Sequence, residues 1–165
     1  MKKFKNAIDK INQCVEYVTI VLIAVMVIVV FLQVIFRFII ERSLAWSEEM
    51  ARYLLIWVTF LGASIGMKRK SHIGVEVVVN LFSERIQVFI RIITNMIMMV
   101  FLVAVIIWSQ RLLAIVSQQR SPAMEISMAI PYTAIVVSSA LMALYILYNI
   151  LLDIIEIRNK KKGLQ

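Results

Sequence analysis

Four stretches of this chain are apolar over the length that a helix needs to cross a membrane. They lie at about Val18–Phe36, Met50–Met67, Ile92–Trp108 and Pro131–Leu152. A membrane-spanning helix requires roughly 20 mostly apolar residues, whereas the buried runs of soluble proteins are shorter. The composition agrees, because 62% of the residues are hydrophobic and only four are glycine and two proline. We therefore predict an all-α integral membrane protein that forms a single domain, residues 1–165.

The predicted spans extend over about 15–36, 48–67, 92–118 and 131–155, and amphipathic segments precede two of them. Between the second and third spans, a helix over about 72–90 has its polar side chains, His72 among them, within an arc of about 120°, and Arg85 is the one charge outside it. Apolar side chains such as Val78 and Phe82 face elsewhere, which predicts a helix lying in the membrane interface and contacting protein as well as lipid. Residues 2–14 show a similar periodicity and predict a lead-in on the membrane surface.

The basic residues are distributed unevenly between the two sides of the predicted bundle. If both termini are cytoplasmic, the N-terminal tail, the middle loop with its helix, and the C-terminal tail hold 13 of the 18 Lys and Arg. This asymmetry matches the positive-inside rule and predicts an N-in/C-in topology in a bacterial inner membrane, with basic tails against phospholipid headgroups. The net charge of +8 is thereby explained without a nucleic-acid partner.

The second span has a charged beginning and is short. Ser47 is predicted as its N-cap, and Glu48 and Glu49 follow in the first turn, where carboxylates oppose the helix dipole. Arg52 lies three or four positions further and shares a face with both. The 15 uncharged residues Tyr53–Met67 span about 22 Å, less than the roughly 30 Å apolar layer. These charges therefore require ion-pair partners, in this chain or another.

Other residues indicate helix contacts. Gln33, near the end of the first span, is suited either to a hydrogen bond between helices or to a headgroup contact. Trp46 is placed for the aromatic belt at the membrane surface. Gly62 and Gly66 form a small-x-x-x-small pair that lets another helix approach closely.

Residue types needed for catalysis or for cofactor binding do not occur together in this sequence. Between their interfacial ends, none of the four spans carries an Asp, Glu, Lys, Arg or His, although proton-coupled exporters of this size need a membrane carboxylate. The single histidine, His72, cannot supply paired haem ligands, and no metal-binding cluster is recognisable. We expect neither enzymatic activity nor a cofactor.

The region from Gln33 to His72 carries several motifs in a fixed order. It reads Gln33-Val-x-x-Arg37, Leu44-x-Trp46-Ser-Glu48-Glu49-x-x-Arg52-Tyr53, Trp57-x-x-Phe60-Leu61-Gly62-Ala63, and then Lys68-Arg69-Lys70 before His72. This arrangement resembles the small membrane subunit, or Q subunit, of tripartite ATP-independent periplasmic (TRAP) transporters. The positions that match the family pattern are Gln33, Arg37, Trp46, Glu49, Arg52, Trp57, Gly62 and His72.

The resemblance implies an accessory role. In this family a larger membrane subunit holds the substrate and sodium sites, a periplasmic binding protein delivers the solute, and the small subunit braces the larger one. Sodium-driven uptake of an organic acid is the implied activity of the whole complex. The alternative from the residues alone is a stand-alone four-helix membrane protein, either a homo-oligomeric exporter or the membrane anchor of a redox complex.

Overall fold

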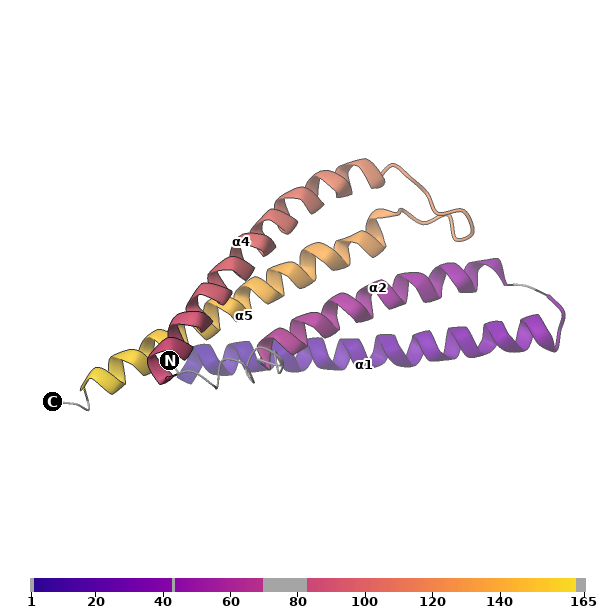
Figure 1. Ribbon diagram of the computed structural model, residues 1–165. Coiled ribbons are helices and arrows are strands. Elements are labelled where there is room, and N and C mark those ends of the chain that lie inside the picture. Colours follow the sequence, from indigo (N-terminus) through magenta and orange to yellow (C-terminus); the bar gives the residue numbers. More distant parts are fainter. Residues whose placement is uncertain (1, 43, 70–82, 163–165) are drawn as a thin grey trace.

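The computed structural model describes residues 2–42, 44–69 and 83–162 and shows four long helices there (Figure 1). They are α1 (Lys2–Phe38), α2 (Ala45–Lys68), α4 (Glu84–Val116) and α5 (Ala129–Lys162). Each contains a stretch long and apolar enough to cross a membrane: Lys5–Phe38, Ala45–Lys68, Phe89–Val116 and Ala129–Leu152. The prediction of four membrane-spanning helices is confirmed.

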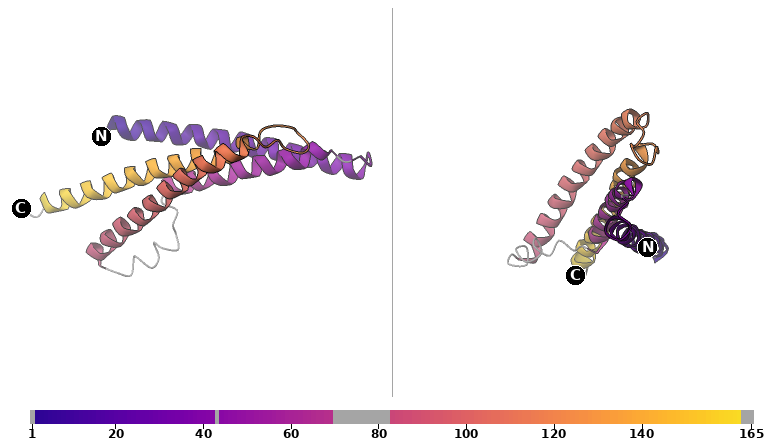
Figure 2. Two further views of the ribbon diagram at one scale, coloured as in Figure 1. Left: turned by 90° about the horizontal axis from the view of Figure 1, so that it is seen from above. Right: turned by 90° about the vertical axis from the view of Figure 1, so that its right-hand side faces the viewer.

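The helices form a row in which each packs mainly on its neighbours. α1 packs against α2, α2 against α5, and α5 against α4, so the spatial order is α1–α2–α5–α4 (Figures 1 and 2). α1 and α2 form one antiparallel hairpin, and α4 and α5 form another. The accessible surface area is 11501 Å², whereas a compact globular protein of this mass exposes about 8,400 Å². The fold is therefore an open row of helices that leaves much apolar surface uncovered.

The two ends of the row differ in what they contain. The start of α1 and the end of α5 lie at one end, together with the end of α2 and the start of α4 (Figure 2). We call this the termini end. The opposite end, the loop end, carries the connections at 39–44 and 117–128. An even number of spans produces this arrangement and accords with both termini facing one side.

One apolar cluster toward the termini end joins the two hairpins. Leu102 of α4 packs there with Met142 and Ile146 of α5, and Met67 of α2 lies against them. Met98 and Met99 are also in contact with this cluster. Methionine side chains are unbranched and adapt to irregular gaps, which suits a junction of three helices. This cluster and the loop-end contacts described below hold the hairpins together.

The helices differ in extent from the predicted segments. Residues 2–14 are the first turns of the unbroken helix α1, so they are not a separate segment on the membrane surface. α4 ends at Val116, within two residues of the predicted end of the third span, and α5 continues as a helix to Lys162, past the predicted end of the fourth span. The amphipathic helix predicted at 72–90 lies largely outside the described residues. From Glu84 onward its residues belong to α4.

Candidate subunit interface

The beginning of α2 is built differently from the sequence prediction. The helix begins at Ala45, and Leu44 occupies the N-cap position without a side-chain cap. Ser47 is fully buried inside the first turn, and its hydroxyl donates to the Leu44 carbonyl at 2.7 Å. The predicted N-cap role of Ser47 is therefore wrong. A serine hydroxyl can bond to the carbonyl three residues earlier, so serine is accommodated inside the first turn of a helix as well as at the N-cap.

Glu49 connects α2 to the loop between α4 and α5. Its Oε1 accepts a hydrogen bond of 2.5 Å from the Tyr53 hydroxyl. Its Oε2 accepts two bonds from successive backbone N–H groups, those of Ala123 at 3.0 Å and Met124 at 2.8 Å. Consecutive N–H groups in a turn form a concave anion-binding site, and here the anion is a side chain of the same protein. Glu49 is only 6% exposed, so its carboxylate is enclosed by these donors.

The loop that receives Glu49 has a defined shape. Ser121 N–H donates to the Ile126 carbonyl at 2.9 Å, and Glu125 N–H donates to the Ser121 carbonyl at 3.1 Å. Glu125 adopts a positive φ of 55°, a conformation that reverses the chain at the tip of the loop. The Met128 sulfur lies 3.2 Å from the Tyr53 hydroxyl oxygen, whose single proton is donated to Glu49. We call this arrangement of Glu49, Tyr53 and the 121–128 turn the Glu49 latch.

The latch corrects the ion-pair prediction for Glu49. Its carboxylate is satisfied by a hydroxyl and two backbone amides, so no cation is needed. Arg52 is exposed, and it forms no ion pair within the part of the chain that the structure describes. Glu48 is exposed as well and receives a long hydrogen bond, 3.4 Å, from Gln33 of α1.

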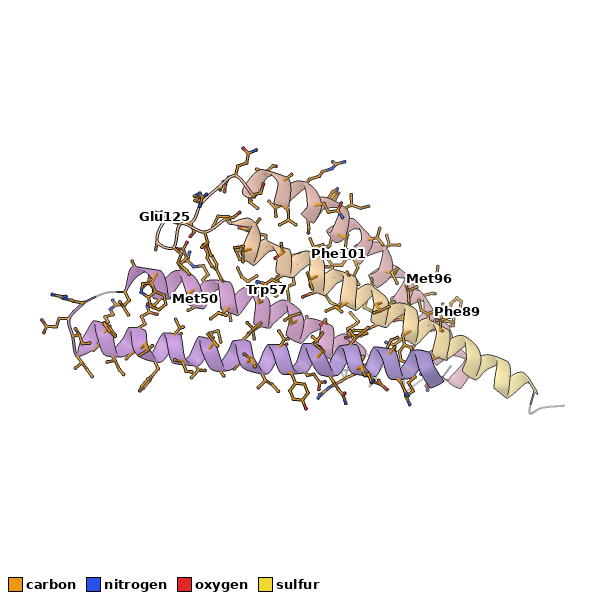
Figure 3. The ribbon with its side chains drawn as sticks, turned by 180° about the vertical axis from the view of Figure 1, so that it is seen from behind. Met50, Trp57, Phe89, Met96, Phe101 and Glu125 are labelled. Carbon is orange, nitrogen blue, oxygen red and sulfur yellow. The ribbon has the colours of Figure 1, made fainter. Side chains whose placement is uncertain are left out.

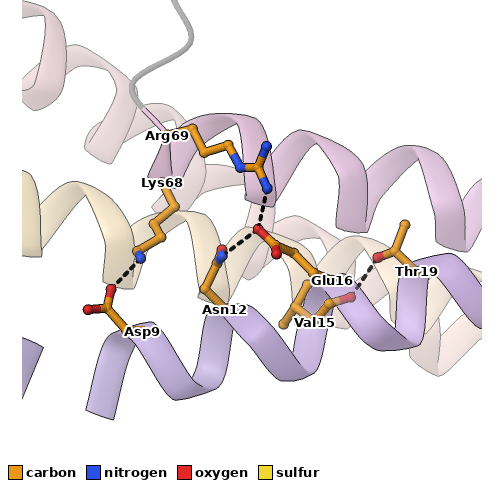
Figure 4. Close-up of polar contacts among 7 residues, drawn as sticks. All are labelled: Asp9, Asn12, Val15, Glu16, Thr19, Lys68 and Arg69. Atoms are coloured by element: carbon orange, nitrogen blue, oxygen red, sulfur yellow. Dashed lines mark hydrogen bonds and ion pairs between the residues drawn. The ribbon is translucent and has the colours of Figure 1, made fainter. Parts of the chain in front are cut away.

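A second polar cluster joins α1 to α2 at the termini end (Figure 4). Lys68 forms an ion pair with Asp9, and Arg69 forms one with Glu16 at 2.7 Å. The amide of Asn12 donates to the same Glu16 oxygen at 2.8 Å. These contacts fix the alignment of the antiparallel hairpin, since they lie on successive turns of α1.

The remaining predicted site residues occupy separate places. Arg37 is in the last turn of α1 with its guanidinium 5.9 Å from the Phe38 ring centre, and Trp46 is exposed in the first turn of α2. Trp57 is half-buried on α2. A Cβ added at Gly62 or Gly66 would meet no described atom within 4 Å, so none of the four described helices approaches them closely. His72, Val78 and Phe82 lie outside the described residues.

Sequence reasoning missed the loop partners of Glu49 and the acidic partners of Lys68 and Arg69. The predicted topology gave part of this information, because it placed the 121–128 segment and the start of α2 on the same side of the membrane.

The exposed apolar surface is extensive on α1 and α4. On α4, Phe89, Met96 and Phe101 are each at least 60% exposed (Figure 3). Such a surface requires lipid or another protein around it.

The four long helices and their exposed apolar surfaces define a multi-pass membrane protein. Residues 26–156 match the family described as tripartite ATP-independent periplasmic transporters, DctQ component. That match covers most of the chain, and the chain belongs to this family, the small permease subunits of TRAP transporters in the bacterial inner membrane. The family resemblance seen in the motifs between Gln33 and His72 is confirmed.

Individual relatives agree with the family assignment. A TRAP transporter small permease protein of Haemophilus influenzae is 37% identical over 90 residues, covering 54% of this chain and 56% of that protein. A second one from the same organism is 22% identical over 157 residues, 95% of both chains. The isethionate TRAP transporter permease protein DctMQ of Oleidesulfovibrio alaskensis is 34% identical over 109 residues, 64% of this chain and 17% of that protein. The chain thus spans about half the length of the first relative and nearly all of the second.

Proposed function

We propose that this chain is a non-catalytic brace for a larger permease subunit in a transporter that takes up an organic acid. The observation that carries the proposal is the open row of helices. Each helix packs mainly on one or two others, and large parts of the surfaces of α1, α2 and α4 stay uncovered. A membrane protein of this shape gains a broad lateral surface for a partner at the expense of an interior that could enclose a solute.

The fused relative supports the large partner. The matched stretch is 17% of the isethionate permease protein DctMQ, so that protein carries several times more chain than this one. We propose that a separate large permease subunit supplies the corresponding part here. The names of other relatives mention C4-dicarboxylate and sialic acid. Isethionate, C4-dicarboxylates and sialic acid are all organic anions, which supports an organic acid as the solute.

The remaining parts of the proposal come from the family resemblance. Sodium drives uptake through the large subunit, and a periplasmic binding protein delivers the solute. Both termini of this chain face the cytoplasm, where the basic tails contact phospholipid headgroups. The described spans have their charged residues at or near their ends, which supports a scaffold over a conducting role.

Two experiments test the proposal. Affinity purification of this chain from its native membrane should recover a much larger polytopic protein in a constant ratio. Recovery of the chain by itself would favour the stand-alone exporter, and recovery with a coloured redox protein would favour the membrane anchor.

The second experiment uses the purified chain in liposomes. Without its partner it should move no organic acid under a sodium or proton gradient. Liposomes that contain both subunits and the binding protein should show sodium-dependent uptake. Gradient-driven uptake by the isolated chain would refute the bracing role.

A further inference from the structure

One side of α2 is exposed but lacks the large apolar side chains that face lipid elsewhere. Its exposed positions from Glu48 to Ala63, together with the half-exposed Gly66, fall within an arc of about 100° on the helix. We call this side the α2 open face. Its members are Glu48, Arg52, Leu55, Thr59, Gly62, Ala63 and Gly66.

The α2 open face contrasts with the exposed side of α4. On α4 the exposed residues are mostly large and apolar, and include Phe101, Ile107 and Trp108. On the α2 open face Leu55 alone is large and apolar, while Thr59 and Ala63 are small. Small residues let a second helix bring its backbone close to α2, whereas lipid chains pack equally well against large apolar side chains. The two exposed surfaces therefore suit different neighbours.

Arg52 gives this face a specific chemistry. The contact between Gln33 and Glu48 places position 48 of α2 beside position 33 of the antiparallel α1. Arg52, four residues along, is consequently level with position 29, where α1 is apolar and Val29 is buried. That level is eight residues, or about 12 Å, further from the loop end than Arg37 on α1.

A guanidinium in this place requires an anion. Arg52 lies inside the candidate membrane span Ala45–Lys68, near its start. An unpaired charge within a membrane span is costly and is normally matched by an opposite one. Within the described part of the chain it forms no ion pair. The neighbouring Glu49 carboxylate is already occupied by the latch, and Glu48 receives Gln33. The matching anion must therefore come from outside the described residues.

We propose that the α2 open face is the docking surface for one transmembrane helix of the large permease subunit, and that Arg52 binds a carboxylate of that helix. The small residues Thr59, Gly62 and Ala63 let its backbone approach, and the charge pair sets its register. A lipid phosphate could neutralise Arg52, but it would leave the strip of small residues below without close packing. The inference rests on the proposed function and adds the surface and its recognition chemistry.

The first test maps the surface with single cysteines in a Cys14→Ser background. Cysteines at Thr59 and Ala63 report on the α2 open face, and those at Val100 and Ile107 report on α4. A membrane-permeant maleimide is applied to the full chain with and without its co-expressed large subunit. In the complex we expect labelling at 59 and 63 to slow by at least about tenfold and labelling at 100 and 107 to change little.

Each other outcome overturns the inference in a distinct way. Unchanged labelling at 59 and 63 in an intact complex means that lipid covers the face, and selective protection of 100 and 107 moves docking to α4. Protection at 59 and 63 without the large subunit, with disulfide-linked dimers of this chain, means that a second copy covers it. If the large subunit does not co-purify at all, the proposed function fails before the surface is tested.

The second test uses substitutions with matched controls on α4. Ala63→Leu should weaken assembly with the large subunit, whereas Ala114→Leu, at an exposed position of α4, should not. Arg52→Gln should lower the affinity of assembly by about tenfold or more, and Arg111→Gln should leave it unchanged. Yield and elution volume of the isolated variants check folding, and equal effects of both members of each pair would refute the inference.

Discussion

The Arg69 guanidinium lies 2.7 Å from the Glu16 carboxylate, so two charges 53 positions apart in the sequence meet at the termini end. The pair crosses from the end of α2 to the second third of α1 and, with Asp9 and Lys68, aligns the hairpin (Figure 4). Two of the basic residues that the positive-inside count places in the cytoplasm are thus each paired with an acidic residue of α1. Their topological effect acts during insertion, whereas in the folded protein they also connect two helices.

Reversal of the Glu16–Arg69 pair tests this connection. Glu16→Arg or Arg69→Glu alone should lower thermal stability in detergent, and the double reversal should restore most of it. Because Arg69 is largely exposed, the pair contributes only about 0.2–1 kcal/mol. Glu41→Arg is the control, since Glu41 lies in the exposed connection between α1 and α2. Equal losses in the single and double variants would show that the pair does not act as a unit.

The Glu49 latch predicts a local effect on the 121–128 turn. Glu49→Ala removes the acceptor of the Ala123 and Met124 N–H groups. A buried donor left without an acceptor costs about 1–3 kcal/mol, and these donors are partly buried, so we expect the lower part of that range. Amide hydrogen exchange at positions 123 and 124 should accelerate by about tenfold, while Glu48→Ala should leave it unchanged. Similar exchange in both variants would show that the turn holds its shape without Glu49.

The topology predicts opposite results for two reporter fusions. Alkaline phosphatase is active only on the periplasmic side, so a fusion after Ser121 should be active and a fusion after Lys162 inactive. The physical reason is the concentration of basic residues at the termini end. Comparable protein levels on a blot are the control. An active fusion after Lys162 combined with an inactive one after Ser121 would reverse the topology.

The predicted surface helix before α4 is testable with water-soluble thiol reagents. Single cysteines between residues 71 and 82 in a Cys14→Ser background should show reactivity with a helical period. We expect reaction at 72, 76 and 80, and protection at 75, 78, 79 and 82. A uniform profile, or one that alternates every second residue, would contradict a helix lying in the membrane plane.

The four helices were predictable because each apolar stretch must satisfy its own backbone hydrogen bonds inside a membrane. The family was predictable from the ordered motifs around Trp46 and Gly62. The role of Glu49 was not, because its partners are backbone N–H groups 74 and 75 positions away, and these carry no residue identity. An acidic residue followed three positions later by Arg52 favours an ion-pair interpretation, and only the fold shows that a turn reaches Glu49 first.

The row of helices also has a mechanical consequence. A bundle arranged around a centre presents one curved surface, but a row presents two broad sides, so one side can be covered by protein while the other faces lipid. A complex formed along such a row is wider than the partner alone in one direction of the membrane plane. In the perpendicular direction it gains only the depth of one helix. If such a partner tilted in the membrane, the whole row would have to move through the surrounding lipid with it. The outer helices α1 and α4 would then resist that movement most, because they lie at the two edges of the row.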